Sequence, residues 1–338
     1  MANKTHHVLA GLLEVDPTWV RVNILPLYSL NPSKRIDTKM DADTMLSRTG
    51  KELGAGVWYP IRLTSSRKYP IPNDEAEQER LDIAHHIYLI LLDGKLVRAP
   101  VSDGIQRILD IGTGTGMWAI DAAETYPSSQ VIGTDLSPIQ PSWVPPNVKS
   151  DWTFERDSFD LIHIRHLNAG IKDWGKLMKQ AFDALKPGGW LDVAEYECRL
   201  KSDDGTLPVG SNLLRYYDLV NEAADKLGQG FVISAFLDKF ILDAGFDKVN
   251  HEEAKVPLGT WPADKKQKDM GAFMLLTTEH AFEAFGMALF TRTLGVATPE
   301  AKELIAGAKM ESRNKKIHSY TIHHLYYTQK PLKKSDLK

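Results

Sequence analysis

Apolar and polar positions follow two different periods along this chain, and together they predict an α/β protein. Short, mostly apolar runs are typical of buried parallel strands, and they occur at 108–111, 130–135, 159–164 and 190–196. Apolar residues at steps of three and four predict helices, which fall at 74–93, 117–126, 173–185, 212–227 and 234–244. Strands that alternate with helices favour a largely parallel sheet covered by helices on both faces.

The last third of the chain predicts a different arrangement. Residues 246–257 are expected to form an antiparallel strand at the sheet edge, and 317–329 a closing strand. Between them, helices at 265–295 and 299–315 are expected to form a lid over a substrate cavity, although such aromatic and methionine stripes are also common in cores. We divide the chain into an N-terminal extension or cap (1–68), a core (69–265), a helical lid insertion (266–316), and a closing strand with tail (317–338).

Residues 1–50 have the weakest pattern. A helix broken at Pro17 and followed by an extended stretch fits the apolar positions between His7 and Val22. Such a segment suits an arm that contacts a second subunit, which makes a homodimer one hypothesis. A plain surface helix explains the same residues equally well.

The stretch RILDIGTGTG joins a predicted strand to a predicted helix through three alternating glycines, Gly112, Gly114 and Gly116. Glycine is needed where the backbone turns sharply or where a ligand lies against bare main chain. The following helix adds free N–H groups and a partial positive charge at its start. A glycine-rich turn without a ligand is the alternative, but strand, turn and helix together favour a site for a nucleotide-like ligand.

The next strand ends in Asp135, where a carboxylate can accept hydrogen bonds from both hydroxyls of a ribose. Dinucleotide sites prefer the spacing G-x-G-x-x-G, whereas this chain has G-x-G-x-G preceded by Asp110. That spacing and that acid are typical of enzymes that use S-adenosylmethionine (SAM) and release S-adenosylhomocysteine (SAH). The sequence therefore predicts a SAM site and disfavours a nicotinamide oxidoreductase.

Several motifs in order make the chain similar to a known family. They are DIGTGTGMWAID, GTDLSPIQPSWVPPNV, FDLIHIRHL, IKDW and LKPGGWLDVAEYE, preceded by YPIPNDEAEQERLDIAHHIYLILLDGKL. Together they resemble the LaeA-like fungal methyltransferases over roughly residues 50–330. The resemblance implies a Rossmann-like class I methyltransferase sheet, mostly parallel with its last strand antiparallel, an N-terminal helical extension and a helical lid.

The resemblance also implies which residues bind the cofactor. The methionine turn is expected to consist of Asp110 and the three glycines. The second strand ends in Asp135 and is followed by Leu136, and both are expected to contact the cofactor. Tyr59 is expected either near the methionine end of the cofactor or in a core aromatic pair. The loop with Ile139 and Trp143 is expected under the adenosine, and the helix with Glu77, Arg80 and His85 is expected to border the pocket.

The carboxyl ends of parallel strands face the ligand in open sheets, which places Arg165, His166 and Asn168 beside the methyl donor. Imidazole titrates near neutrality, so His166 is the candidate general base, with a packing histidine as the alternative. His163 alternates with Ile162 and Ile164 and is interpreted as an ordinary strand residue. Glu195 and Tyr196 are expected to face the substrate side.

The chain departs from the family after the proline-rich loop. Only Val148 to Ser158 separate that loop from the strand at 159–164, which hardly accommodates the third strand of relatives and its acidic tip. Either Asp151 or Trp152 substitutes, or the adenine edge of the site is open. This departure bears on cofactor affinity more than on fold.

Composition and charge narrow the possible partners and cellular locations of the protein. The formal net charge is −3, with 41 basic and 44 acidic residues, so nothing indicates nucleic acid. Apolar runs long enough for a membrane span and a signal peptide are both missing, which predicts no membrane partner and a cytoplasmic, or else nuclear, location. Cys198 is the single cysteine and is interpreted as a buried strand residue. His318, His323 and His324 lack companion ligands, so we expect no metal site.

These patterns together predict a SAM-dependent methyltransferase that acts on a small-molecule, secondary-metabolite acceptor by in-line transfer. Two alternatives stay open. The chain is either a regulator of secondary metabolism that works with a protein partner, as the resemblance also implies, or a methyltransferase-fold enzyme with a different reaction. The acceptor atom cannot be chosen from sequence.

Overall fold

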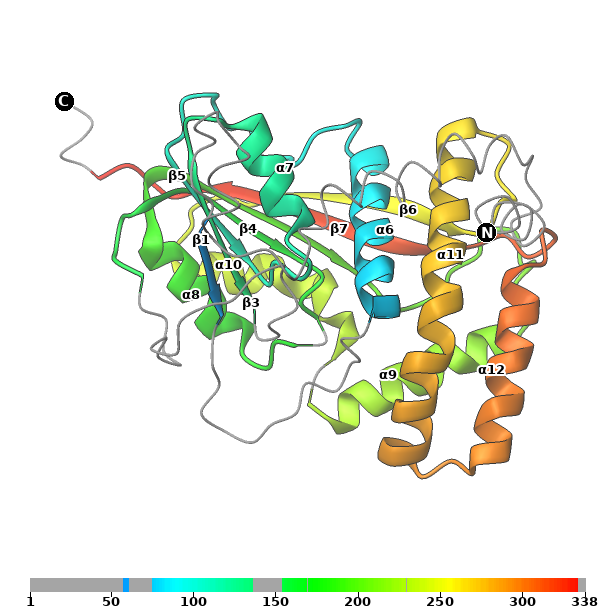
Figure 1. Ribbon diagram of the computed structural model, residues 1–338. Coiled ribbons are helices and arrows are strands. Elements are labelled where there is room, and N and C mark those ends of the chain that lie inside the picture. The colour runs from blue at the N-terminus through cyan, green and yellow to red at the C-terminus, as the bar shows by residue number, and fades with distance from the viewer. Residues whose placement is uncertain (1–56, 61–74, 136–153, 169, 229, 334–338) are drawn as a thin grey trace, which may run out of the picture.

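The computed structural model describes residues 57–60, 75–135, 154–168, 170–228 and 230–333 (Figure 1). They form a seven-stranded sheet in the order β1-β3-β2-β4-β5-β7-β6. Neighbouring strands from β1 to β5 are parallel, and β7 runs antiparallel to both β5 and β6. This confirms the predicted class I methyltransferase sheet. The strands are β1 (Val57–Pro60), β2 (Arg107–Ile111), β3 (Gln130–Asp135), β4 (Phe159–Arg165), β5 (Leu185–Tyr196), β6 (Asn250–Leu258) and β7 (Ser319–Gln329).

Helices cover the sheet and extend beyond one end of it. Figure 1 shows α9, α11 and α12 gathered at that end, beside α6, while α8 and α10 lie together farther along the sheet. The predicted helices are present, although 234–244 splits into a 3-10 turn and α10, and 265–295 into α11 and a π-helical turn. The elements are α6 (Glu75–Leu91), α7 (Met117–Thr125), α8 (Trp174–Ala184), α9 (Asn212–Lys226), η1 (Phe231–Phe236), α10 (Leu237–Ala244), α11 (Lys265–Met287), η2 (Ala288–Leu294) and α12 (Thr298–Ser312).

Local chemistry explains where several helices begin. Asp173 caps α8 by accepting a hydrogen bond from the backbone N–H of Lys176, and Ser211 caps α9 in the same way. Asp264 accepts from the N–H of Gln267 at the start of α11. Each cap satisfies a backbone donor that the helix itself leaves without a partner.

The prediction that the fifth strand begins at Trp190 is wrong. Leu185 already pairs with Phe159, and the register between β4 and β5 shifts before Leu161 pairs with Trp190. Gly189 permits this irregularity, because a Cβ there would lie 2.9 Å from the carbonyl oxygen of Lys186 and 3.0 Å from that of Phe159. The LKPGG motif therefore ends the helix and also forms the irregular start of the strand.

The edge of the sheet beside β3 is occupied by β1, whose Tyr59 pairs with Thr134 along the backbone. The sequence pattern does not predict this strand, which comes from the segment assigned to the N-terminal extension. The expected contacts of Leu136, Ile139, Trp143, Asp151 and Trp152 lie outside the described residues. The described part of the shortened segment, 154–158, contains no strand.

The helical layer has its own apolar core. It joins Ile87 of α6, Tyr216 of α9, Phe273 of α11 and Leu304 of α12 to Val256 of β6, all of them buried. The helices inserted before the last strand therefore pack with α6 and α9, which precede β6 in the chain. We call α9, α11 and α12 the helical roof. It lies beside α6, at the end of the sheet where β2 and β4 terminate (Figure 1).

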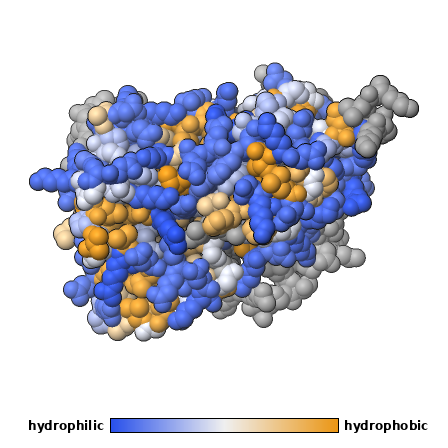
Figure 2. Space-filling model, turned by 180° about the vertical axis from the view of Figure 1, so that it is seen from behind, coloured by the Kyte–Doolittle hydropathy of each residue, from blue (hydrophilic) through white to orange (hydrophobic). Residues whose placement is uncertain are grey.

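The surface seen from behind is mostly hydrophilic, with hydrophobic residues in small separate groups (Figure 2). Within the described ranges, none of the helices combines the length and the apolar character that crossing a bilayer requires.

Candidate functional site

The glycine turn after β2 is held by the end of β3. The backbone N–H groups of Gly112 and Thr113 donate to the carbonyl of Thr134 at 2.7 and 2.9 Å. Gly112 has a φ of 72°, in the left-handed region that favours glycine, and a Cβ there would lie 2.1 Å from Cδ2 of Leu167. The chain can therefore make this turn only with bare main chain at that position.

Two carboxylates hold the glycine turn through hydrogen bonds. Asp135 accepts a hydrogen bond from the N–H of Gly114 at 2.8 Å. Asp110 is buried and accepts from the hydroxyl of Thr113 at 2.6 Å, while its other oxygen lies 2.8 Å from Nδ1 of His163. One oxygen of Asp110 therefore orients the glycine turn, and the other contacts His163 of the neighbouring strand β4.

His163 is a site residue that the sequence pattern missed. It lies opposite Asp110 in the β2–β4 register, and its ring stacks on Trp118 of α7 with centroids 3.8 Å apart. A histidine on an otherwise apolar buried strand, beside a strand that carries a buried acid, was the available signal. Its position follows from the pairing of the two strands, which the sequence does not state.

A hollow of about 440 Å³ lies against the glycine turn, and we call it the glycine-turn hollow. It is bounded by α6, by the turn, by the start of α7 and by the end of β4. Its lining includes Asp110, Gly112, Gly114, Arg165 and His166, so the structure brings together five of the predicted site residues. The other lining residues are Leu81, Ala84, His85, Thr113, Thr115, Met117, Trp118 and His163.

Arg165 brings a half-buried positive charge to this hollow. Its guanidinium donates to Nδ1 of His85 at 3.0 Å and lies over the ring of Tyr88 at 5.1 Å from the centroid. Nε2 of His85 in turn lies 2.9 Å from Asp121, so His85 donates there and accepts from Arg165. Across the described ranges, Arg165 forms no ion pair with a carboxylate. Burial lowers the pKa of Arg165 and lowers that of His85 to about 4.

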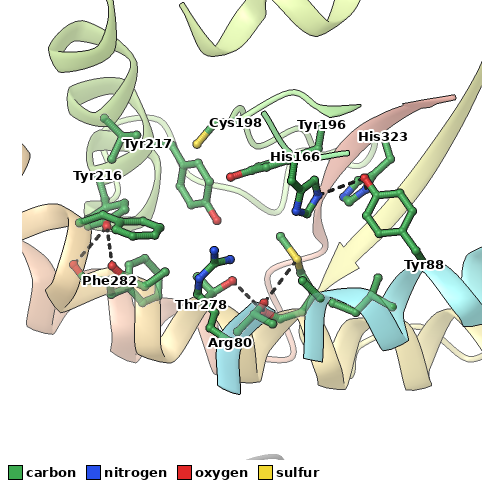
Figure 3. A pocket seen from close by; sticks show the side chains of 17 residues that line it. Arg80, Tyr88, His166, Tyr196, Cys198, Tyr216, Tyr217, Thr278, Phe282 and His323 are labelled. Atoms are coloured by element: carbon green, nitrogen blue, oxygen red, sulfur yellow. Dashed lines mark hydrogen bonds between the residues drawn. The ribbon is translucent and has the colours of Figure 1, made fainter. Parts of the chain in front are cut away.

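A second cavity of about 670 Å³ opens beneath the helical roof, and we call it the aromatic chamber (Figure 3). Figure 3 shows Tyr196, Tyr217 and His166 pointing into the same space, with Arg80 at its side. The chamber shares Ala84 and His166 with the glycine-turn hollow. The rest of the lining is Ile87, Tyr88, Cys198, Tyr216, Val220, Met274, Thr277, Thr278, Ala281, Phe282, Phe285 and His323.

His166 stands where the two cavities meet. Its φ of 56° is unusual for a residue other than glycine, and its Nε2 lies 3.1 Å from the hydroxyl of Tyr88. That hydroxyl also lies 3.0 Å from Nδ1 of His323, whose buried Nε2 has no hydrogen-bond partner among the described residues. Burial, and then the nearby charges of His323 and Arg165, hold the pKa of His166 well below its usual value. The imidazole is therefore neutral and able to accept a proton.

Other predicted residues divide between the cavity and the surrounding structure. Tyr196 lines the chamber, but the expectation that Glu195 faces the substrate side is wrong, because neighbouring strand residues point to opposite faces. Glu195 accepts from the backbone N–H groups of Leu167 and Asn168, and burial raises its pKa to about 8. Cys198 is buried as expected, although two residues past the end of β5, and burial raises its pKa to about 12.

The buried histidines give the protein a measurable pH dependence. Burial lowers the pKa of His323 to about 3, so below pH 6.5 the unfolded chain binds a proton that the folded chain does not. We expect His323 to cost about 1.4 kcal/mol of stability between pH 7.5 and pH 5.5. Urea unfolding at both pH values should therefore show a pH-dependent loss smaller by that amount in His323→Gln than in the unmodified chain.

The comparison between the two proteins is needed because Glu195 acts in the opposite direction. Its raised pKa means that the folded chain binds the proton first, so its contribution grows as pH falls below 8. That contribution is common to both proteins and cancels in the difference. An equal pH-dependent loss in the two would show that His323 is protonated normally in the folded state.

Comparisons with known proteins agree with this geometry. The model of a methyltransferase domain family matches residues 77–251. Methyltransferase pytC of Aspergillus terreus is 38% identical over 321 residues, which cover 90% of this chain and 99% of that protein. The secondary metabolism regulator LAE1 of Cochliobolus heterostrophus is 34% identical, with 78% of this chain and 90% of that protein covered.

A third relative is the protein-methionine methyltransferase laeA of Emericella nidulans, which is 33% identical and covers 78% of this chain and 73% of its own length. The matched segment contains the glycine turn, Asp135 and the end of β4. The motifs, the sheet and these relatives together show that the chain belongs to the LaeA-like family of fungal methyltransferases.

Proposed function

We propose that this methyltransferase uses SAM in the glycine-turn hollow and methylates a small, largely apolar acceptor held in the aromatic chamber. The observation that carries the proposal is that the two cavities meet at His166. Methyl transfer requires donor and acceptor in line and in contact, and holding them so supplies a large part of the rate. A donor site and an acceptor site with a common wall meet that requirement.

The residues of the hollow fit the methionine half of SAM. Gly112 leaves main chain exposed where any side chain would collide with Leu167. Arg165 offers a half-buried cation for the methionine carboxylate, and Asp110 holds the turn that the ligand would lie against. When bound, SAM supplies a methyl group on a positively charged sulfur, and its transfer leaves neutral SAH.

Asp135 is proposed to hold the ribose. It lies at the tip of β3, and its bond to Gly114 links the ribose end of the site to the turn. Leu136 and the side chain of Tyr59 remain proposed contacts from the family resemblance, and both lie outside what the structure describes.

The chamber favours a small molecule with aromatic or other flat apolar character. Most of the surface that lines it is apolar. Tyr196, Tyr216, Tyr217 and Phe282 supply ring surfaces. The polar groups of the lining are Arg80, two threonines, two histidines and the tyrosine hydroxyls. Such a lining binds mainly by apolar burial and orients the ligand through a small number of hydrogen bonds.

His166 is the proposed base for an acceptor that arrives protonated. If Tyr88 donates its hydroxyl proton to Nδ1 of His323, it accepts from Nε2–H of His166. The remaining ring nitrogen of His166, Nδ1, then carries the lone pair that would take the proton of the acceptor atom, as that atom gains the methyl group and the methyl–sulfur bond of SAM breaks. Tyr88 and His323 act as positioning residues, since they set the tautomer and orientation of His166.

The donor half of the proposal is tested by SAH titration calorimetry on the full chain. We expect Asp135→Ala to weaken SAH binding roughly tenfold to hundredfold, because hydrogen bonds to a charged group contribute about 1.5–3 kcal/mol. Asp103→Ala is the matched control, since Asp103 is an exposed acid in the loop before β2. No heat with the unmodified chain, or equal affinity in both variants, would remove the SAM assignment.

A regulatory role is the second candidate, and similarity to LAE1 favours it. A polypeptide acceptor is also compatible with the relative named as a protein-methionine methyltransferase. Incubation with labelled SAM separates these cases, because label appears in small molecules for the first proposal and in protein for the second. Retained SAM binding without any methylated product would instead favour a different reaction on the same fold.

A further inference from the structure

The antiparallel pair of β6 and β7 brings together three potential metal ligands that are distant in sequence. His251 and Glu253 alternate along β6 and so share one face, and Glu253 pairs directly with His324 of β7. Figure 1 shows the two strands side by side at the edge of the sheet. The nitrogen and oxygen atoms that these three side chains can offer all lie within 4.8 Å of one another.

The two imidazoles are placed as neighbouring ligands of one ion. Nε2 of His251 lies 2.9 Å from Nδ1 of His324, and Oε1 of Glu253 lies 3.9 Å from the same Nδ1. Two nitrogens bound to one tetrahedral Zn²⁺ are roughly 3.3 Å apart, given metal–nitrogen distances of about 2.0–2.1 Å. Small side-chain movements at the exposed His251 and Glu253 suffice to reach that geometry.

The surroundings of His324 already orient it for a metal. Its ring is buried, and its Nε2 lies 3.2 Å from Oε1 of Glu197, whose other oxygen pairs with Lys201 at 3.0 Å. A metal-binding histidine usually donates its second N–H to a carboxylate, which fixes the tautomer and strengthens the ligand. With the proton of His324 on Nε2, its Nδ1 lone pair points toward His251. His251 is itself stacked on Tyr326 at 4.1 Å between ring centroids.

We propose that His251, Glu253 and His324 bind one Zn²⁺, with Glu197 orienting His324. Two imidazoles and one carboxylate suit zinc and not Mg²⁺ or Ca²⁺, which prefer oxygen ligands. The ion ties the edge strand β6 to β7 just before the chain enters α11 of the helical roof. The site is separate from the glycine-turn hollow and the aromatic chamber, so it does not depend on the proposed methyl transfer.

This proposal departs from the expectation that the C-terminal histidines bind no metal. The sequence shows no companion ligands close to these histidines, whereas the strand pairing brings His251 beside His324 from 73 positions earlier in the chain. His323 points to the opposite face, toward Tyr88, and His318 lies beside Asp204. Only His324 of the three faces the cluster.

Titration calorimetry with zinc chloride, on chelator-treated full chain without an affinity tag, tests the site. We expect one Zn²⁺ per chain, and a loss of affinity of at least roughly tenfold in His251→Ala and in Glu253→Gln. Both side chains are exposed, so these variants should fold, whereas replacing the buried His324 would confound folding with binding. Zn²⁺ should also raise the melting temperature of the unmodified chain and not that of His251→Ala.

The matched control is His318→Ala, which removes another partly exposed histidine, directly before β7, and should bind Zn²⁺ unchanged. Magnesium chloride should give no binding. The proposal is overturned if the unmodified chain does not bind Zn²⁺, or if His251→Ala and Glu253→Gln bind it as tightly as His318→Ala. Neither outcome bears on SAM binding, which is measured separately with SAH.

Discussion

Gly112→Ala is expected to reduce methyl transfer roughly hundredfold and to weaken SAH binding. The added methyl group would lie 2.1 Å from Cδ2 of Leu167, so either the glycine turn or Leu167 must move. Leu167 follows His166 directly, and a displacement there also shifts the wall shared by the two cavities. A misplacement of about 1 Å at reacting groups can lower a rate about a hundredfold. SAH calorimetry and turnover with labelled SAM measure the two effects.

Two other glycines separate the causes of this effect. Gly94 has a φ of 80° with open space around a Cβ, so Gly94→Ala introduces backbone strain without a collision. Gly104 has open space and no left-handed φ, so Gly104→Ala introduces neither. We expect Gly94→Ala to lose about 1–2 kcal/mol of stability while keeping its SAH affinity. If Gly112→Ala binds SAH and turns over like Gly104→Ala, the turn does not contact the donor.

His166→Asn is expected to lower the turnover number by about 10²–10⁴-fold while changing SAH affinity much less. Asparagine tolerates the left-handed backbone that His166 adopts at a φ of 56°, so this variant removes the base without adding strain. The imidazole is the titratable group common to the walls of both cavities, and its burial keeps it neutral. Single-turnover rates with bound donor separate this chemical defect from weak binding.

Tyr88→Phe is the companion variant for His166. It keeps the ring under Arg165 and removes only the hydroxyl that lies between His166 and His323. We expect a smaller loss of turnover than in His166→Asn, because the base remains and only its orientation is freed.

In the unmodified chain, the turnover number should not fall between pH 8 and pH 6, because the lowered pKa of His166 keeps its imidazole neutral. A solvated histidine of pKa 6.5 would lose about fourfold of its neutral form over the same range. Unchanged turnover in His166→Asn would exclude His166 as the base.

The strength of local patterns decided how much the sequence revealed. The apolar runs at 108–111, 130–135 and 159–164 coincide with β2, β3 and β4 because a fully buried parallel strand leaves a compact apolar run. Gly112 and Asp135 could be identified because the turn and the strand tip are adjacent to those strands in sequence. The start of β5 differs from the predicted one because its first residues contain one proline and two glycines, which normally end an element.

The sequence pattern does not predict the role of residues that depend on a partner distant in the chain. The alternation around His163 predicts an ordinary strand residue. Its role in the site follows from its pairing with Asp110 on the adjacent strand. Tyr88 and His323 approach His166 only because α6 and β7 pack at the end of β4. Glu195 and Tyr196 were assigned to one side, whereas the pleat of the strand sends them to opposite faces.

The sequence by itself determined the order of strands and helices from α6 onward, the glycine turn with its two carboxylates, and membership of the methyltransferase family. These features are encoded by residues close together in the chain, where periodicity and glycine chemistry act locally. The tertiary structure decided where the two cavities meet, which histidine lies between them, and which histidine of β7 faces β6. Those facts depend on strand register and helix packing, because contacts between distant segments bring the groups together only after the chain has folded.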